Sequence, residues 1–205
     1  MGLLAFMLAF TFGIAAARRD TKRELFLDEV TAISTTYLRT SLIPELHQSE
    51  VRNLLKEYVD LRVATYGHPD KLMAAIEKSK DIQNRLWTHV AALAGKNLKN
   101  PEIALLFIDS MNEMFDIQTK RVAVGFYHIP GIIWIILAAL TVISMAVMGY
   151  QFGLSVRGNR LVSMGLALTF SMVILLIADL DRVSSGWLKV SNQSMVELQQ
   201  EMNRE

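Results

Sequence analysis

The chain has 205 residues, with 21 Lys and Arg against 20 Asp and Glu, so its formal net charge is only +1. This balance lacks the basic excess that nucleic acids require, and we exclude them as partners. There is no cysteine, and the four histidines are widely spread, so neither a disulfide nor a metal site is expected. No nucleophile or phosphate-binding motif occurs either. The sequence therefore predicts no cofactor and no enzyme.

The first apolar segment, Gly2 to Ala17, is followed at once by four basic residues, Arg18, Arg19, Lys22 and Arg23. Its length suits a short spanning helix or the hydrophobic region of a signal peptide, and Ala15-Ala16-Ala17 resembles a cleavage site. Because no basic residue precedes the segment, a stop-transfer pattern fits better. We predict an uncleaved first transmembrane helix over residues 1–17.

Residues 18–128 are rich in charge, which balances closely, and they are predicted to form a helical cytoplasmic region. Over residues 20–43, apolar side chains recur at steps of four, three and four: Phe26, Val30, Ile33 and Tyr37. This spacing places them on one helical face. Neither Gly nor Pro interrupts residues 14–43, so the membrane helix is expected to continue as one rod and to end near Pro44.

Three more helices are expected in this region. The second runs from about Pro44 to Tyr66 and ends at the turn Gly67-His68-Pro69. The third covers residues 70–94, and its heptad-like spacing predicts a seam for other helices or for a partner. The seam consists of Leu72, Ile76, Ser79, Gln83, Leu86, Val90 and Leu93.

The fourth helix should begin after Asn100, with Pro101 at its first position, and continue to about Tyr127. Its predicted apolar side is Leu105, Ile108, Phe115 and Val122. A second stripe is mostly acidic: Asp109, Glu113, Asp116 and Lys120. We interpret this stripe as a solvated face with an ion pair between Asp116 and Lys120. The alternative is a charged vestibule or a subunit contact.

Residues 129–182 form a predicted transmembrane hairpin. Its apolar runs, 131–154 and 161–180, each have about the 20 residues that cross about 30 Å of hydrocarbon. Neither run contains a charge before Asp179. Small and hydroxylated residues in the runs permit close helix contact and are alternatively candidates for a pore lining. The pore candidates are Ser144, Ser163, Thr169 and Ser171.

The position of two acidic residues at the predicted inner end of the hairpin is the most unusual feature of the chain. Asp179 and Asp181, with Arg182 beside them, oppose the dipole at a helix C-terminus and lie at the edge of the hydrocarbon. Antiparallel packing against the first helix would bring Arg18 and Arg19 to the same level. We therefore predict a structural or gating charge cluster of these five residues.

Charged residues on the rod are expected to contact other helices or another subunit. Asp28 and Arg39 share one face, and Glu29 lies on a neighbouring strip. Adjacent carboxylates on one helix point about a hundred degrees apart, so a catalytic dyad is not expected. Together with Asp109 and Glu113, these residues are the predicted contacts of the cytoplasmic helices.

The distribution of cations sets the expected orientation. Most basic residues near the membrane ends lie on one side, which places residues 18–128 and the tail, 183–205, in the cytoplasm and the link, 155–160, outside. No stretch alternates with a period of two, so no sheet is expected. The predicted fold is all-α, with about three transmembrane helices and a helical cytoplasmic region, in a multi-pass protein of a cell membrane such as a bacterial inner membrane.

Several segments resemble, in order, the pattern of the bestrophin-like membrane family of unknown function. They are Leu8-Ala9-Phe10-Thr11-Phe12, Asp28-Glu29-Val30-Thr31-Ala32-Ile33, Tyr37-Leu38-Arg39, Tyr58-Val59-Asp60-Leu61-Arg62, Phe107-Ile108-Asp109, Pro130-Gly131-Ile132-Ile133-Trp134, Gly149-Tyr150 and Asp179-Leu180-Asp181-Arg182. Members of that family usually have another membrane helix ahead of the Leu8 segment. Either the start of this chain was assigned too late, or the chain is a shortened member that lacks the usual first membrane helix and has its N-terminus outside.

The family is named for its likeness to bestrophins, so the resemblance implies a function only by way of that likeness. Bestrophins are pentameric anion channels with four membrane helices and a helical cytoplasmic region. It suggests a homo-oligomer, a pentamer by resemblance only, that lies in a lipid bilayer and conducts inorganic ions. The alternative hypothesis is a non-conducting membrane scaffold or sensor whose cytoplasmic helices bind a partner through the heptad-like seam.

Overall fold

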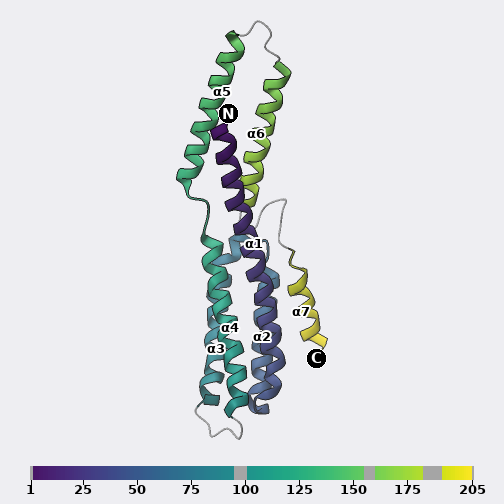
Figure 1. The fold of residues 1–205 in the computed structure, drawn as a ribbon. Coiled ribbons are helices and arrows are strands. Elements are labelled where there is room, and N and C mark those ends of the chain that lie inside the picture. Colours follow the sequence, from purple (N-terminus) through teal and green to yellow (C-terminus); the bar gives the residue numbers. More distant parts are fainter. Residues whose placement is uncertain (1, 95–100, 155–159, 182–190, 205) are drawn as a thin grey trace. The chain divides into compact units, whose positions relative to one another are not determined.

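The computed structural model in Figure 1 describes residues 2–94, 101–154, 160–181 and 191–204. These residues form helices and short turns and contain no strand, which confirms the predicted all-α class. The chain divides into two compact units. We call residues 1–21 and 127–188 the membrane unit, and residues 22–126 and 189–205 the helical unit.

Helix α1, Gly2–Arg39, is continuous, and its two ends belong to different units (Figure 1). This confirms the predicted rod. The short 3-10 turn Thr40–Leu42 and Pro44 separate it from the next helix. The other helices of the helical unit are α2 (Glu45–Thr65), α3 (Leu72–Ala94, after a 3-10 turn at Pro69–Lys71), α4 (Pro101–Phe126) and α7 (Gln193–Arg204). The membrane unit adds α5 (Gly131–Leu154) and α6 (Arg160–Asp181).

Local chemistry sets the bounds of α2. Its first turn is anchored by the carbonyl of Pro44, which accepts hydrogen bonds from the backbone nitrogens of His47 and Gln48 at 2.9 and 3.2 Å. The turn after the helix contains Gly67 at φ +76°, a left-handed conformation that costs glycine little. The predicted end of the helix at this turn is therefore correct.

Leucines of the α3 seam pack inside the helical unit. Leu86 and Leu93 are fully buried in the same cluster as Leu55 and Tyr58 of α2. The heptad-like spacing thus reflects contact with neighbouring helices of the same chain. The seam is not a free surface for a partner.

The predicted apolar side of α4 is only partly correct. Ile108 and Phe115 are partly buried and pack against the core, whereas Leu105 is 54% exposed. The most buried strip lies about one position away and consists of Ala104, Phe107, Ser110, Met111, Met114, Ile117 and Gln118. Three of these residues are small or polar, so a prediction from large apolar residues placed the face about one position off.

Helix α7 was not predicted, because residues 183–205 were interpreted as a tail. Met195, Leu198 and Met202 are buried in the core of the helical unit, and the hydroxyl of Tyr37 donates to the carbonyl of Met202 at 3.4 Å. Their spacing of three and four residues was the available signal. A short amphipathic stretch at a chain end becomes a stable helix only through such packing.

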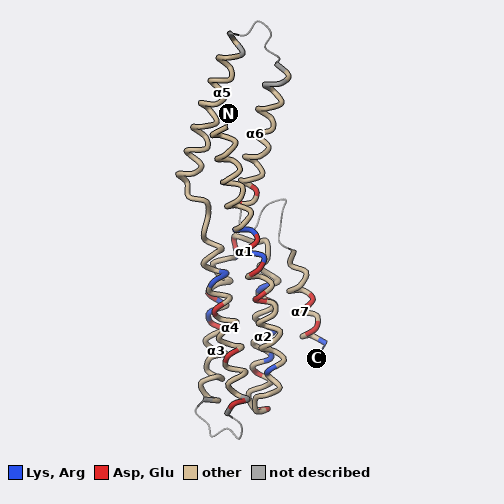
Figure 2. Tube along the Cα trace, viewed as in Figure 1, with Lys and Arg blue, Asp and Glu red and all other residues tan. Residues whose placement is uncertain are grey.

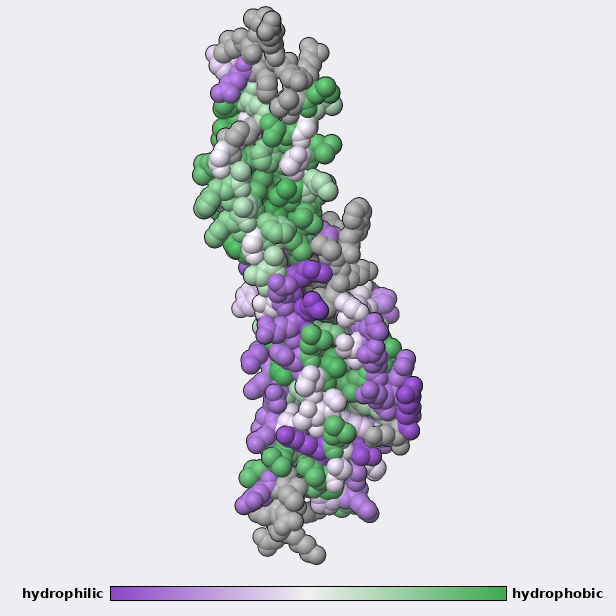
Figure 3. Space-filling model, turned by 45° about the vertical axis from the view of Figure 1, so that its right-hand side comes forward, coloured by the Kyte–Doolittle hydropathy of each residue, from purple (hydrophilic) through white to green (hydrophobic). Residues whose placement is uncertain are grey.

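The membrane unit buries few of its apolar side chains. Its core includes Leu4, Leu8, Leu137 and Ile177, whereas Leu175 remains 70% exposed. Three stretches of the described residues are long and apolar enough to cross a membrane, as predicted: Gly2–Leu42, Ala104–Gln151 and Met164–Asp181. Charges are concentrated on the helical unit in Figure 2, and the surface of α5 and α6 is mostly hydrophobic in Figure 3. This apolar surface suits a lipid solvent.

Candidate functional site

Glu29 lies at the centre of a buried polar cluster in the helical unit. Its side chain is fully buried on α1, and three groups from other helices approach the carboxylate. The hydroxyl of Tyr58 donates to Oε1 at 2.7 Å, and Nη2 of Arg62 donates to Oε2 at 3.3 Å. Arg121 of α4 forms an ion pair with the same Oε2. The cluster therefore joins α1, α2 and α4.

The cluster contains two cations for one anion. Burial raises the pKa of Tyr58 to about 12, with the charge of Arg62 acting against the shift, so the phenol stays neutral and can donate. Burial lowers the pKa of Arg121 to about 10, which still leaves the guanidinium protonated at neutral pH. Arg121 also lies over the ring of Phe26, 5.3 Å from its centroid. Glu29 thus compensates charges that would otherwise be uncompensated in the core.

The last turns of α1 are tied to α4 by hydrogen bonds to backbone carbonyls. Nη1 of Arg39 donates to the carbonyl of Leu106 at 2.6 Å, and the buried hydroxyl of Thr36 donates to that of Ser110 at 3.1 Å. These acceptors are four residues apart, one turn along α4. These two hydrogen bonds and the Glu29 cluster hold the second half of α1 at several positions along its length.

Other predicted contact residues are on the surface of the helical unit. Asp28 on α1 is exposed, and so are Asp109 and Glu113 on α4. The exposure of the last two agrees with the interpretation of the α4 stripe as a solvated face. The ion pairs within 4 Å formed by the described residues do not include one between Asp116 and Lys120. Sequence spacing correctly marked the exposed stripe but not this pair.

At the end of α6, Asp181 has a partner that was not predicted. Its Oδ1 accepts a hydrogen bond at 2.9 Å from the backbone nitrogen of Ile129, just before α5. The ion pairs of the described residues do not join Asp181 to Arg18 or Arg19. Asp179 is partly buried, and Arg182 lies outside the described residues. Asp181 therefore connects the start of α5 to the end of α6.

The candidate pore residues do not share one surface. Thr169 and Ser171 are both exposed on α6, but residues two apart on a helix point about 200° apart. Ser144 of α5 is half-buried, and the side chain of Ser163 lies outside the described residues. At most one of the two exposed hydroxyls can face a given pathway.

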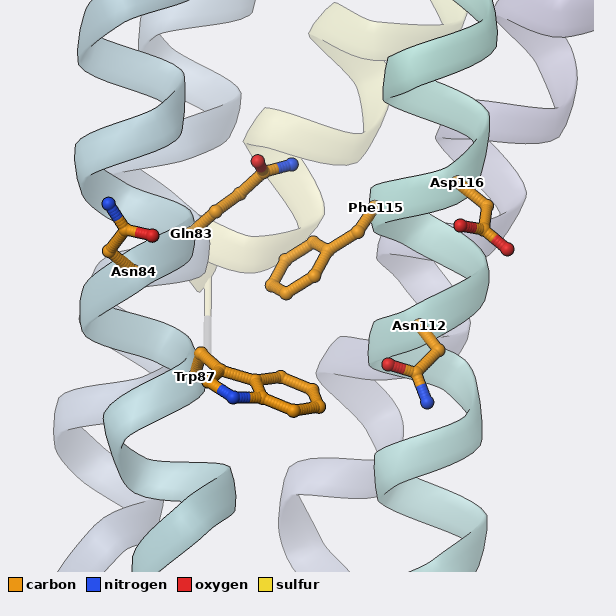
Figure 4. A pocket seen from close by; sticks show the side chains of 6 residues that line it. All are labelled: Gln83, Asn84, Trp87, Asn112, Phe115 and Asp116. Atoms are coloured by element: carbon orange, nitrogen blue, oxygen red, sulfur yellow. The ribbon is translucent and has the colours of Figure 1, made fainter.

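A pocket of about 340 Å³ lies between α3 and α4 (Figure 4). The rings of Trp87 and Phe115 extend toward each other, with centroids 6.4 Å apart, whereas Asn84 and Asp116 point to opposite sides. Gln83 and Asn112 complete the lining. These six side chains offer two rings for stacking, three amides for hydrogen bonds and the carboxylate of Asp116.

Sequence reasoning missed the partners of Glu29. It expected Glu29 to contact another helix or subunit, but Tyr58, Arg62 and Arg121 were not connected with it. Tyr58 and Arg62 were named in a segment that resembles the family. Polar residues on apolar helical faces were the available signal, because a buried charge requires a partner.

Three spans and a charged helical unit define an integral membrane protein of the all-α class. Comparison with known families then identifies the family: the model described as Bestrophin-like domain matches residues 2–195, nearly the whole chain. The chain belongs to this bestrophin-like family. No curated protein and no solved structure matches it.

Proposed function

We propose that the chain is one subunit of a homo-oligomeric channel for inorganic ions, with anions as the expected permeant species. Residues 18–128 and the C-terminal region lie in the cytoplasm in this proposal. Membership of the bestrophin-like family is the observation that carries it. The proposal includes no catalytic step and no cofactor.

The continuity of α1 supports a channel whose cytoplasmic part influences its membrane part. The first turns of α1 belong to the membrane unit, and the Glu29 cluster holds its later turns against α2 and α4. A helix that is fixed at one end transmits a small rotation or shift to the other end, since its backbone hydrogen bonds resist bending. The Glu29 cluster is therefore a positioning element for the span.

The exposed hydroxyl of Thr169 is our choice for the pathway. Gly165 lies one turn before it on α6 and leaves open space beside the hydroxyl, although Leu166 and Met172 on the same side are exposed. Ser171 lies between the exposed Leu168 and Leu175 and has no glycine one turn away. The hydroxyl of Thr169 donates to the carbonyl of Gly165 at 2.9 Å, so in this proposal it exchanges that bond for one to a passing anion.

The alternative scaffold or sensor has weaker support. It depended on the heptad-like seam, and that seam is buried in the chain's own core. A partner would have to use another face, such as the exposed acidic stripe of α4 that includes Asp109 and Glu113.

Single-cysteine chemistry tests the channel proposal cleanly, because the natural chain has no cysteine. We expect the purified oligomer, reconstituted in liposomes, to conduct chloride. An anionic, membrane-impermeant thiol reagent, which an anion pathway admits, should alter flux through Thr169→Cys. The same reagent should leave Ser171→Cys unchanged, and this variant is the matched control on the opposite side of α6.

Each failure has a distinct meaning. A well-folded oligomer that conducts no tested anion or cation would reject the channel. Normal conduction with sensitivity only at Ser171→Cys would retain the channel but reject the choice of strip. Recovery of one specific cytoplasmic partner by the full chain, without flux, would favour the scaffold.

A further inference from the structure

Two histidines that are far apart in the sequence meet in the helical unit. His47 lies in the first turn of α2, and His89 lies near the end of α3. Their Nδ1 atoms are 3.2 Å apart, although 42 positions separate the residues. Sequence spacing gave no sign of this pair, because it detects ligands and partners only along one helix or motif.

The geometry is that of a hydrogen bond between the rings. The ring centroids are 5.5 Å apart, so the two nitrogens lie between the rings and close to the line that joins their centres. A metal ion on that line would be only 1.6 Å from each nitrogen, half of the 3.2 Å separation. Bonds between zinc and histidine nitrogen are about 2.0–2.1 Å, so the arrangement favours N–H···N.

Such a contact tolerates one added proton but not two. In the neutral pair, one Nδ1 donates and the other accepts. One added proton preserves the hydrogen bond, because the imidazolium still donates to a neutral ring. A second proton leaves two N–H donors facing each other on two cations. The contact then becomes repulsive.

Charged groups lie on both helices that carry the contact. Nε2 of His89 is 3.8 Å from Oε2 of Glu50 on α2, and Glu50 is one turn after His47. Glu45 precedes His47 by two residues. On α3, Arg85 lies one turn before His89 and pairs with Glu57 of α2 at 3.3 Å. Whichever ring takes the first proton, the second proton breaks the contact.

We propose that the His47–His89 pair is a proton-sensitive latch between the start of α2 and the end of α3. It keeps this end of the helical unit closed near neutral pH and releases it on acidification. The latch is independent of the proposed ion conduction, because it depends only on contacts within the helical unit.

Stability measurements on the full chain in detergent test the latch. The wild-type melting temperature is compared at about pH 7.5 and about pH 5.5, on either side of the ordinary histidine range near pH 6.5. In His47→Gln, an amide that does not titrate replaces the ring. We expect the acid-induced decrease to be smaller in this variant by about 2–4 °C, the effect of one lost hydrogen bond in a chain of this size.

The matched control is His68→Gln, which removes an exposed histidine outside the pair and should keep the wild-type decrease. Carbon-13 labelling of histidine gives a second readout that does not depend on stability. His47 and His89 should titrate as a coupled pair, and replacing either residue should convert the other to a single simple titration. Independent titrations, or a wild-type acid response in both His47→Gln and His89→Gln, would overturn the latch.

Discussion

The two units of this chain are both made of helices, yet they treat polar and apolar side chains in opposite ways. The helical unit buries its leucines and also buries a charged cluster around Glu29. The membrane unit leaves large apolar side chains such as Leu175 on its surface. Threonine hydroxyls do not differ in this way: Thr11, Thr141 and Thr169 each donate to the carbonyl four residues earlier, and Thr31 and Thr65 of the helical unit do the same.

The solvent explains this difference. Water drives apolar groups inward, and a charged group can follow them only if other groups compensate it. Lipid exerts no such force between helices, so apolar residues remain outside. Side-chain burial therefore measures stability in the helical unit but not in the membrane unit.

Paired leucine truncations should show the largest contrast between the units. Leu86→Ala removes a fully buried side chain from the helical unit and should lower the free energy of unfolding by about 3–4 kcal/mol through lost burial and a cavity. Leu175→Ala, on the exposed surface of α6, should change it by less than about 0.5 kcal/mol. Denaturation of the full chain in mixed micelles measures both. Equal losses would mean that the lipid-facing surface of α6 is packed in the assembly.

Removal of the buried carboxylate tests the charged core. Glu29→Ala leaves Arg62 and Arg121 without their anion and should cost about 3 kcal/mol, at the low end for a broken buried pair because both arginines remain partly exposed. Asp28→Ala is the exposed neighbour and should be nearly neutral. Trp87 fluorescence in a background of Trp134→Phe and Trp187→Phe reports on the helical unit alone. Similar values for the two variants would show that the cluster adds no stability.

Tyr58→Phe removes one donor to Glu29 and leaves both arginines in place. We expect a loss of about 1.5 kcal/mol, typical of a hydrogen bond to a charged group. The same Trp87 assay applies, with Tyr66→Phe, a half-buried tyrosine at the end of α2, as the control. A neutral result would indicate that the arginines alone satisfy the carboxylate.

The smallest expected effect lies in the membrane unit. Asp181→Ala removes the acceptor for the backbone nitrogen of Ile129 and should cost about 1 kcal/mol in mixed micelles. Asp181→Asn keeps an oxygen acceptor and should lose less. If both substitutions cost the same, the negative charge of Asp181 matters more than this hydrogen bond, and the predicted cluster with Arg18 and Arg19 regains support.

The sequence by itself determined the features that depend on neighbours along the chain. Runs of apolar residues located the spans, steps of three and four located α1 to α4, and Pro44 and Gly67 marked where helices end. An ordered series of short segments indicated the family. These features are local because helix periodicity and membrane length act on consecutive residues.

Only the tertiary structure decided which distant residues meet. It brought Glu29 to Arg121 and joined His47 to His89. It also placed the buried strip of α4 about one position from the predicted one and packed α7 into the core. The rotation of a helix and the partner of a buried charge depend on how side chains from several helices fill one space. Packing and desolvation set these contacts, and neither is encoded in the spacing of residues on a single helix.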